Sequence, residues 1–221
     1  MSLPLTGPSL PPKSGKPPKQ VVILLHGLGA DGEDLIGLAP YFAQALPDAE
    51  FLAPHAPYPC DMAPFGRQWF SLQDRHPEAL RAGLMQIQPI FDAYLDAVLA
   101  QRGLTEADAA LIGFSQGTML ALHCALRRKT PVAALIGYSG LLAAPDQLIE
   151  EIASRPPILL VHGEQDSVVD FAFMDLAART LAMLEVPVTA LARPGLDHSI
   201  DEEGLSRGIE FLADAFGGNQ A

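Results

Sequence analysis

A serine inside a glycine-bracketed pentapeptide is the residue of this sequence best suited to covalent chemistry. Residues 113–117 are Gly-Phe-Ser-Gln-Gly, which fits the pattern G-x-S-x-G. An apolar run that we predict to be a strand precedes Ser115, and a predicted helix follows it. A sharp turn from strand to helix strains the serine backbone and requires glycines where side chains would collide with neighbouring main chain. We therefore predict that Ser115 is a nucleophile.

A serine hydroxyl at its ordinary pKa is a weak nucleophile, so a general base and an orienting acid must accompany it. Asp166 and His198 each follow an apolar run predicted to be a strand, and they occur in the chain order serine, acid, histidine. Asp197 is a poorer candidate for the acid because adjacent side chains rarely converge on the ring Nδ1. Asp170 is expected to cap the next helix. The predicted triad is Ser115, Asp166 and His198.

The other five histidines fit structural roles better. His26 and His162 each precede a glycine at a predicted strand end, where they are expected to shape loops. His123 lies within a predicted helix and is expected to pack. His55 and His76 lie next to or near prolines, with no strand to place them.

A glycine-rich loop follows the first predicted strand. Its sequence at residues 26–32 is His-Gly-Leu-Gly-Ala-Asp-Gly, and the glycines allow the main chain to approach a bound carbonyl closely. The expected oxyanion donors are the backbone N–H groups of Leu28 and Gln116. The loop also fits G-x-G-x-x-G, but no acidic residue ends a second strand about twenty positions later and no G-K-[ST] is present. These absences argue against a nucleotide-binding loop.

The elements that position these residues alternate along the chain from residue 20 onward. The predicted strands are 21–25, 50–53, 109–114, 132–138, 158–161 and 188–192, and the predicted helices are 35–46, 80–98, 116–128, 145–153, 171–184 and 201–216. This alternation predicts a single-domain α/β fold with a mostly parallel sheet covered by helices on both faces. In such folds ligands bind outside the carboxyl ends of the strands, which is where the predicted triad residues lie.

We expect one domain at residues 20–221, preceded by a proline- and lysine-rich arm at residues 1–19 that is extended or partly mobile. A long irregular stretch covers residues 54–73, and loops of that length inside compact domains are usually functional. With 49% hydrophobic and 18% charged residues, the 221-residue chain can bury a sizeable core. Its apolar runs are shorter than the roughly 18 residues of a spanning helix, which predicts a soluble protein without stable membrane insertion.

The charge balance is acidic, with 14 basic and 26 acidic residues and a formal net charge of −12. This balance argues against nucleic acid as a partner and against recruitment to anionic lipid. One basic cluster, at residues 127–129, lies where a predicted helix ends, and the helix dipole explains it. Cys60 and Cys124 form no disulfide framework or metal pattern, and no cofactor is expected. Together with the lack of a signal-peptide pattern, this usage favours the cytoplasm.

Several segments together resemble the acyl-protein thioesterase and lysophospholipase branch of the α/β-hydrolases, whose bacterial members are often called carboxylesterases. The segments are 26–32, 67–70, 113–117, 138–140, 162–169 and 194–200. The resemblance runs from about residue 21 to the last helix. It implies Ser115, Asp166 and His198 as the triad, with the Leu28 and Gln116 amides as the oxyanion hole.

The same resemblance implies that residues 59–70 line the acyl or substrate groove, without a large cap domain, and that a homodimer is common. The apolar, proline-bracketed character of this stretch supports the expectation, and its aromatic residues are Phe65, Trp69 and Phe70. Three residues depart from the family pattern, because Gly, Pro and a small residue are usual at the positions of Thr118, Asp170 and Asp197. None of these departures removes a catalytic group, so they bear on substrate preference.

These observations predict a serine carboxylesterase that hydrolyses carboxylic esters, or thioesters, of short to medium acyl chains through a covalent acyl-enzyme. A lysophospholipase or acyl-protein thioesterase acting on long acyl chains is the alternative. The substrate in either case is a small-molecule ester or a lipid. A non-catalytic binding protein with a hydrolase fold is a third reading, but such proteins generally lose a triad residue, and all three are present here.

Overall fold

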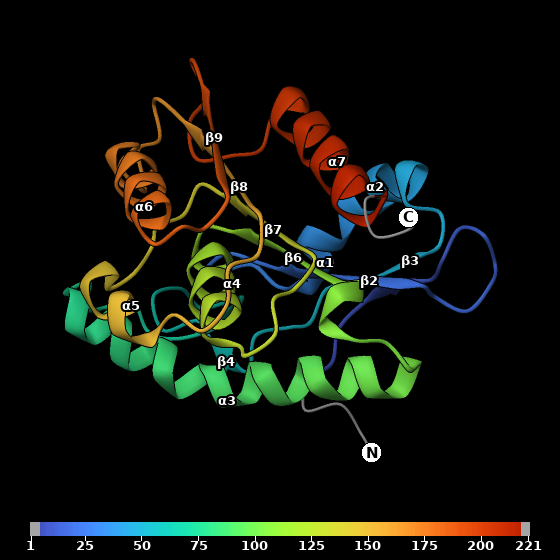
Figure 1. The fold of residues 1–221 in the computed structure, drawn as a ribbon. Coiled ribbons are helices and arrows are strands. Elements are labelled where there is room, and N and C mark those ends of the chain that lie inside the picture. The colour runs from blue at the N-terminus through green and yellow to red at the C-terminus, as the bar shows by residue number, and fades with distance from the viewer. Residues whose placement is uncertain (1–4, 218–221) are drawn as a thin grey trace.

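The central sheet has seven strands in the order β1 (Ser9–Leu10), β3 (Ala49–Leu52), β2 (Gln20–Leu25), β6 (Ala109–Phe114), β7 (Ala134–Tyr138), β8 (Ile158–Gly163) and β9 (Val188–Arg193) (Figure 1). All neighbouring strands are parallel except β1 and β3, which are antiparallel. The structure is a computed structural model and describes residues 5–217. Each of the six predicted strands is present, with small differences at the ends.

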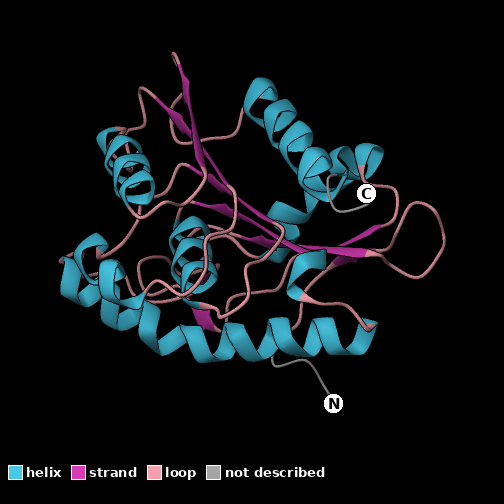
Figure 2. Cartoon of the chain, viewed as in Figure 1, coloured by secondary structure: helices cyan, strands magenta, loops and turns pink. Residues whose placement is uncertain are grey.

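The helices are α1 (Gly32–Leu35), α2 (Ala39–Ala45), α3 (Pro77–Arg102), α4 (Gln116–Arg127), α5 (Pro145–Glu151), α6 (Ala172–Met183) and α7 (Glu202–Gly217), with 3-10 turns η1 (Ile36–Leu38) and η2 (Glu106–Asp108). One sheet face packs against α3, α4 and α6, and the other packs against α2 and α7 (Figure 2). The predicted α/β architecture is therefore confirmed. Within residues 5–217, no helix combines the length and apolarity needed to cross a membrane.

The central strands β2, β6, β7 and β8 are buried on both faces, which explains their continuous apolar runs. In β2, Val21 and Ile23 belong to the core on the α3 and α4 side, whereas Val22 and Leu24 belong to the core on the α2 and α7 side. All four side chains are fully buried. A sheet that is covered in this way leaves the carboxyl ends of its strands as the place where polar side chains can meet.

Two residues of the N-terminal arm form a sheet strand, which the expectation of an extended or partly mobile arm did not specify. Ser9 pairs with Leu52 and Leu10 pairs with Phe51, so β1 forms the sheet edge. Leu5 is also buried. A strand of two residues in a proline-rich segment has no detectable periodicity, and its pairing depends on β3 rather than on its own sequence.

The basic cluster at the end of α4 is bound by acidic side chains, which the helix-dipole explanation did not include. Arg127 Nε donates to Glu151 Oε2 at 2.8 Å, and Arg128 donates to Asp92 Oδ1 at 3.1 Å and to Glu106 Oε1 at 2.8 Å. These ion pairs tie α4 to α5, α3 and η2. The two arginines therefore serve the packing of the helices.

Candidate active site

Ser115 occupies the sharp turn between β6 and α4. Its backbone has φ 53° and ψ −114°, a conformation that residues other than glycine rarely adopt. The flanking glycines are sterically required: a Cβ at Gly113 would lie 2.5 Å from the Thr118 Cα, and one at Gly117 would lie 1.8 Å from the Leu25 carbonyl oxygen. The turn thus presents Ser115 at the N-terminus of α4, as the sequence pattern predicts.

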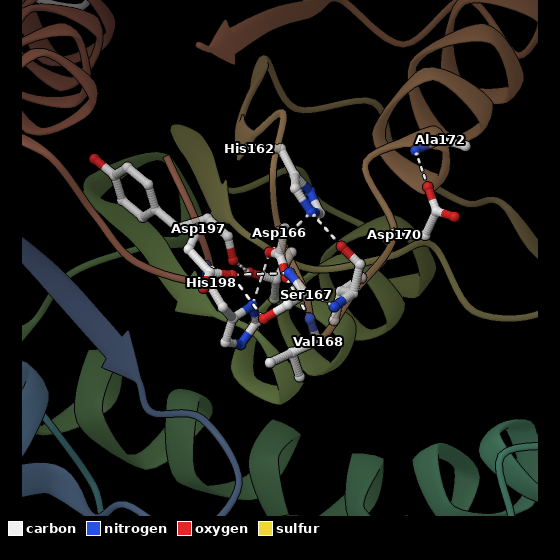
Figure 3. Close-up of polar contacts among 11 residues, drawn as sticks. His162, Asp166, Ser167, Val168, Asp170, Ala172, Asp197 and His198 are labelled. Atoms are coloured by element: carbon white, nitrogen blue, oxygen red, sulfur yellow. Dashed lines mark hydrogen bonds and ion pairs between the residues drawn. The ribbon is translucent and has the colours of Figure 1, made fainter. Parts of the chain in front are cut away.

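Asp166 and His198 come from the loops after β8 and β9 and meet directly (Figure 3). The His198 Nδ1 lies 2.8 Å from Asp166 Oδ2. The other carboxylate oxygen, Oδ1, accepts the backbone N–H groups of Val168 and Val169 at 2.9 and 2.8 Å. Because the carboxylate accepts, Nδ1 carries the imidazole proton and Nε2 is left as the basic nitrogen.

The environment of Asp166 keeps its carboxyl group ionised. Its side chain is fully buried, and burial by itself raises the pKa of the carboxyl. The hydrogen bonds from Val169, His198 and Val168 outweigh that effect, so the pKa of Asp166 lies below its ordinary value. An ionised acid is what an orienting partner for histidine requires.

Ser115 and His198 line the same cavity at the carboxyl edge of the sheet. The ring of Phe114 packs against the His198 ring, with centroids 4.9 Å apart at an interplanar angle of 50°. Within the described residues, no hydrogen bond joins the Ser115 hydroxyl to the imidazole. Catalytic hydrogen bonds are often long when no substrate is bound, and the three predicted residues do converge on one edge.

The two predicted oxyanion donors belong to the loop after β2 and to the residue that directly follows Ser115. Leu28 lines the cavity, and Gln116 is the first residue of α4. Neither backbone N–H donates to a protein acceptor within residues 5–217. A main-chain donor at a helix N-terminus and another in a glycine-rich loop form the usual arrangement for binding a developing oxyanion.

A cavity of about 700 Å³ opens beside Ser115. Its walls come from the segment before α3, the start of α3, α4, the loop after β7 and α6, and most of the lining side chains are apolar. They include Leu72, Leu80, Met119, Leu142, Val169 and Phe173. Its volume falls within the range of small-molecule sites, roughly 300–1,000 Å³, and its walls suit an apolar group.

The aromatic residues predicted to bind substrate do not line this cavity, so that prediction is corrected. Trp69 is fully buried and Phe70 is only 4% exposed, whereas Phe65 is 73% exposed to solvent, and none of the three lines the cavity. The error arose because apolar residues in a long loop were assumed to face a ligand, whereas two of them join the main core. The sequence contains no local signal that separates these outcomes.

Trp69 instead binds the loop that carries Leu28. Its indole Nε1 donates to the His26 carbonyl at 2.9 Å, and its backbone N–H donates to the Gln116 side-chain oxygen at 2.9 Å. The Gln116 side-chain nitrogen donates to the Phe70 carbonyl at 2.7 Å. The indole and the amide side chain thus fix the two predicted oxyanion segments relative to each other.

Two other histidines support the site, beyond the loop-shaping role expected for them. His26 is fully buried, and its Nε2 accepts the Ala56 N–H at 3.0 Å. Burial lowers the pKa of His26, which favours the neutral ring. His162 Nε2 lies 2.9 Å from the Val169 carbonyl and 3.1 Å from Asp166 Oδ2 (Figure 3).

Two of the departures from the family pattern have clear structural partners. Thr118 donates its hydroxyl to the Tyr138 carbonyl at 2.8 Å, and Cβ atoms at Gly137 or Gly140 would lie less than 3 Å from its side chain. Asp170 accepts the Ala172 N–H at 2.9 Å at the start of α6, which is the capping role expected for it. Among residues 5–217, no group of three or more His, Cys, Asp or Glu side chains is arranged to hold a metal ion.

The fold and the strained serine turn define an α/β-hydrolase. Residues 12–215 match the model of the phospholipase/carboxylesterase family, and the chain belongs to this family. It is accordingly an enzyme of the ester-hydrolase class.

Curated relatives and a solved structure agree with this assignment. The chain is 29% identical over 197 residues to esterase YpfH of Escherichia coli strain K12, covering 89% of this chain and 83% of that protein. It is 28% identical over 210 residues to acyl-protein thioesterase 1 of Neurospora crassa, covering 87% and 85%. The crystal structure of esterase PE8 superposes with a TM-score of 0.91 at 42% identity, covering 96% of this chain and 99% of that one.

Proposed function

We propose that this protein is a serine carboxylesterase whose nucleophile, base and orienting acid are Ser115, His198 and Asp166. The observation that carries the proposal is the 2.8 Å contact between His198 Nδ1 and Asp166 Oδ2 at the same sheet edge as the strained serine. This contact leaves Nε2 free to accept a proton from the serine hydroxyl. The attacking oxygen then forms a bond to the ester carbonyl carbon.

The tetrahedral intermediate carries a negative oxygen, which the N–H groups of Leu28 and Gln116 stabilise. His198 returns its proton to the leaving alcohol or thiol as the acyl-enzyme forms. Water then attacks the acyl carbon with His198 again acting as base, and the carboxylic acid leaves. Asp166 stays ionised throughout and stabilises the imidazolium.

We propose carboxylic esters of short to medium acyl chains as substrates, together with the corresponding thioesters. The names of the relatives, an esterase and an acyl-protein thioesterase, support an alcohol and a thiol as leaving groups. The cavity of about 700 Å³ has more room than an acetyl group needs, and this favours a second candidate function. That candidate is a lysophospholipase or acyl-protein thioesterase with a long acyl chain in the cavity.

The decisive experiment compares wild-type protein with Ser115→Ala, using p-nitrophenyl butyrate and a fluorophosphonate probe. Loss of a triad residue should lower kcat by roughly 10⁴-fold or more, and labelling should disappear with the hydroxyl. Hydrolysis close to the wild-type rate by the pure variant would refute the assignment. Ser71→Ala, at an exposed serine outside the cavity, is the matched control and should behave as wild type.

A panel of oxygen esters and thioesters of graded acyl length separates the two candidate functions. A maximum of kcat/KM at four to eight carbons, roughly, supports the short-chain esterase, since a chain that leaves the cavity adds no further apolar burial. A kcat/KM that keeps rising to palmitoyl substrates assigns the long-chain function instead.

We also propose that the protein works in the cytoplasm as a homodimer, with residues 20–221 as one hydrolase domain. The free Cys60 and buried, unpaired Cys124 support a reducing compartment. The family resemblance supports the dimer. Analytical ultracentrifugation tests the dimer through the mass of the species in solution, and localisation of a tagged chain tests the compartment.

A further inference from the structure

The carboxylate of Asp197 joins the two loops that carry the acid and the base. Its Oδ1 accepts three hydrogen bonds, from the Ser167 N–H at 2.8 Å, the Ser167 hydroxyl at 2.9 Å and the His198 N–H at 2.8 Å (Figure 3). Ser167 directly follows Asp166 in the chain. One oxygen therefore bridges the residue after the acid to the backbone of the base.

Asp197 does not compete with Asp166 for the imidazole. The His198 Nδ1 is occupied by Asp166 Oδ2, and the contact of the Asp197 carboxylate with His198 is to the main-chain N–H. The two carboxylates thus have separate tasks, one on the ring and the other on the backbone that carries the ring.

The loop that holds His198 has no helix or strand of its own between β9 and α7. Other ties to the acid loop are main-chain hydrogen bonds, from Gln165 N–H to the Leu196 carbonyl at 3.0 Å and from Glu164 N–H to the Arg193 carbonyl at 3.0 Å. Both lie further from the imidazole along the chain. Of these contacts between the two loops, the bridge through Asp197 lies next to His198, where a displacement of the ring would most affect catalysis.

Titratable side chains of both loops lie near this bridge. Asp166 pairs with His198 and with His162, and Glu164 lies on the acid loop with an exposed side chain. Arg193, at the end of β9, is bound to Asp201 and Glu203 at 2.9 Å each. Hydrogen bonds from the backbone and hydroxyl of Ser167, and then from the His198 N–H, lower the pKa of Asp197, so its carboxyl is ionised at neutral pH.

We propose that Asp197 is a positioning residue that clasps the His198 loop to the Asp166 loop and adds a second negative charge beside the imidazole. The inference rests on the proposed function, because it assigns His198 the role of general base. A small residue at this position would lack both the clasp and the charge.

The test separates the clasp from the charge with two variants, Asp197→Asn and Asp197→Ala. Asparagine keeps an oxygen acceptor for the three donors, whereas alanine removes it. We expect Asp197→Ala to lower kcat by about tenfold with KM within about twofold, and Asp197→Asn to keep kcat within about twofold of wild type, since only the clasp places the ring. Ser167→Ala, which removes one of the three donors, should give a smaller loss than Asp197→Ala.

The charge is tested by the pH dependence of kcat/KM, whose acidic limb reports protonation of the general base. Both Asp197 variants should move the midpoint of this limb to lower pH by about 0.3 units at low ionic strength, because a nearby anion that favours the imidazolium is lost. Glu164→Gln removes an exposed charge of the loop that carries Asp166 and should leave the midpoint unchanged. Circular dichroism at the assay temperature verifies that each variant is folded.

Wild-type kinetics for Asp197→Ala would overturn the clasp, as would equal losses in folded Asp197→Asn and Asp197→Ala. An acidic limb that is unmoved in both variants would overturn the role of the charge. The rate of fluorophosphonate labelling distinguishes failure of the proposed function from failure of the role assigned to Asp197. If the wild-type protein does not react, the proposed function itself fails; if wild type and Asp197→Ala react equally fast, only the role of Asp197 fails.

Discussion

The imidazole of His198 binds one defined oxygen of Asp166. Although the two residues are 32 positions apart, Nδ1 and Oδ2 lie 2.8 Å from each other. The opposite oxygen, Oδ1, is held by the N–H groups of Val168 and Val169. The orientation of the carboxyl group is therefore fixed by the backbone before it meets the histidine.

This arrangement predicts a severe effect of Asp166→Asn. The two backbone donors require an acceptor, so the asparagine oxygen takes the Oδ1 position and its NH₂ group faces His198. A donor at that place forces the proton onto Nε2, which then cannot accept the serine proton, and kcat should fall by roughly 10⁴-fold. Steady-state kinetics with a short acyl ester measures the change.

Asp170→Asn is the matched control for that experiment. It makes the same change of charge four residues further on, in the cap of α6, and should leave kcat within about twofold of wild type because it does not touch the triad. Activity of Asp166→Asn comparable to this control would mean that another group orients the imidazole.

Trp69→Phe tests the corrected role of the tryptophan. Phenylalanine keeps the buried ring but loses the donor to the His26 carbonyl, so the oxyanion loop loses one of its ties. We expect kcat to fall by about tenfold, with KM and acyl-length preference unchanged, because the oxyanion is bound only in the transition state. Phe65→Ala, at the exposed aromatic, should leave all three quantities as in wild type. A shift of the acyl-length preference in Trp69→Phe would indicate that the tryptophan does contribute to the substrate pocket.

Ala143→Phe tests the position of the acyl pocket. Ala143 lines the cavity and is 6% exposed, so a phenyl ring there occupies space that longer acyl chains would need. We expect the optimum of kcat/KM to move to shorter chains, with acetate hydrolysis retained within about threefold because the catalytic groups are untouched. Ala100→Phe, exposed near the end of α3, is the control. An unchanged length profile would place the acyl chain elsewhere.

The stability of the protein should fall on acidification because of His123. Burial, with a smaller contribution from the positive charge of Arg127, lowers the pKa of His123 to about 4. Between pH 6.5 and 4 the unfolded chain binds a proton here and the folded protein does not, so stability is lost as the pH falls through this window. From pH 7 to pH 5, this residue alone should contribute a loss of about 2 kcal/mol.

Urea unfolding at pH 7 and pH 5 measures this loss in wild type and in His123→Gln. The variant should lose less stability over the interval, by about the stated amount, because glutamine does not titrate. His76→Gln, at an exposed histidine, should retain the wild-type dependence. Identical pH dependence in His123→Gln and wild type would contradict the assignment.

The sequence by itself predicted the candidate catalytic residues and determined the class of fold. Ser115, Asp166 and His198 could be selected because each follows an apolar run, and the carboxyl ends of parallel strands must meet at one edge. The central strands are predictable because burial on both faces requires a continuous apolar run. The glycines around Ser115 are likewise a local requirement, set by contacts of the turn with its own neighbours.

Tertiary structure alone decided which side chains form the pocket and which hold the catalytic loops. Trp69 and Phe173 are both aromatic and could not be told apart by pattern, yet one is buried in the core and the other lines the cavity. Likewise, the sequence reveals that Asp197 is adjacent to His198 but not that Ser167 lies against it. Such contacts join segments about thirty residues apart, and their geometry depends on how the whole sheet and its loops pack rather than on local periodicity.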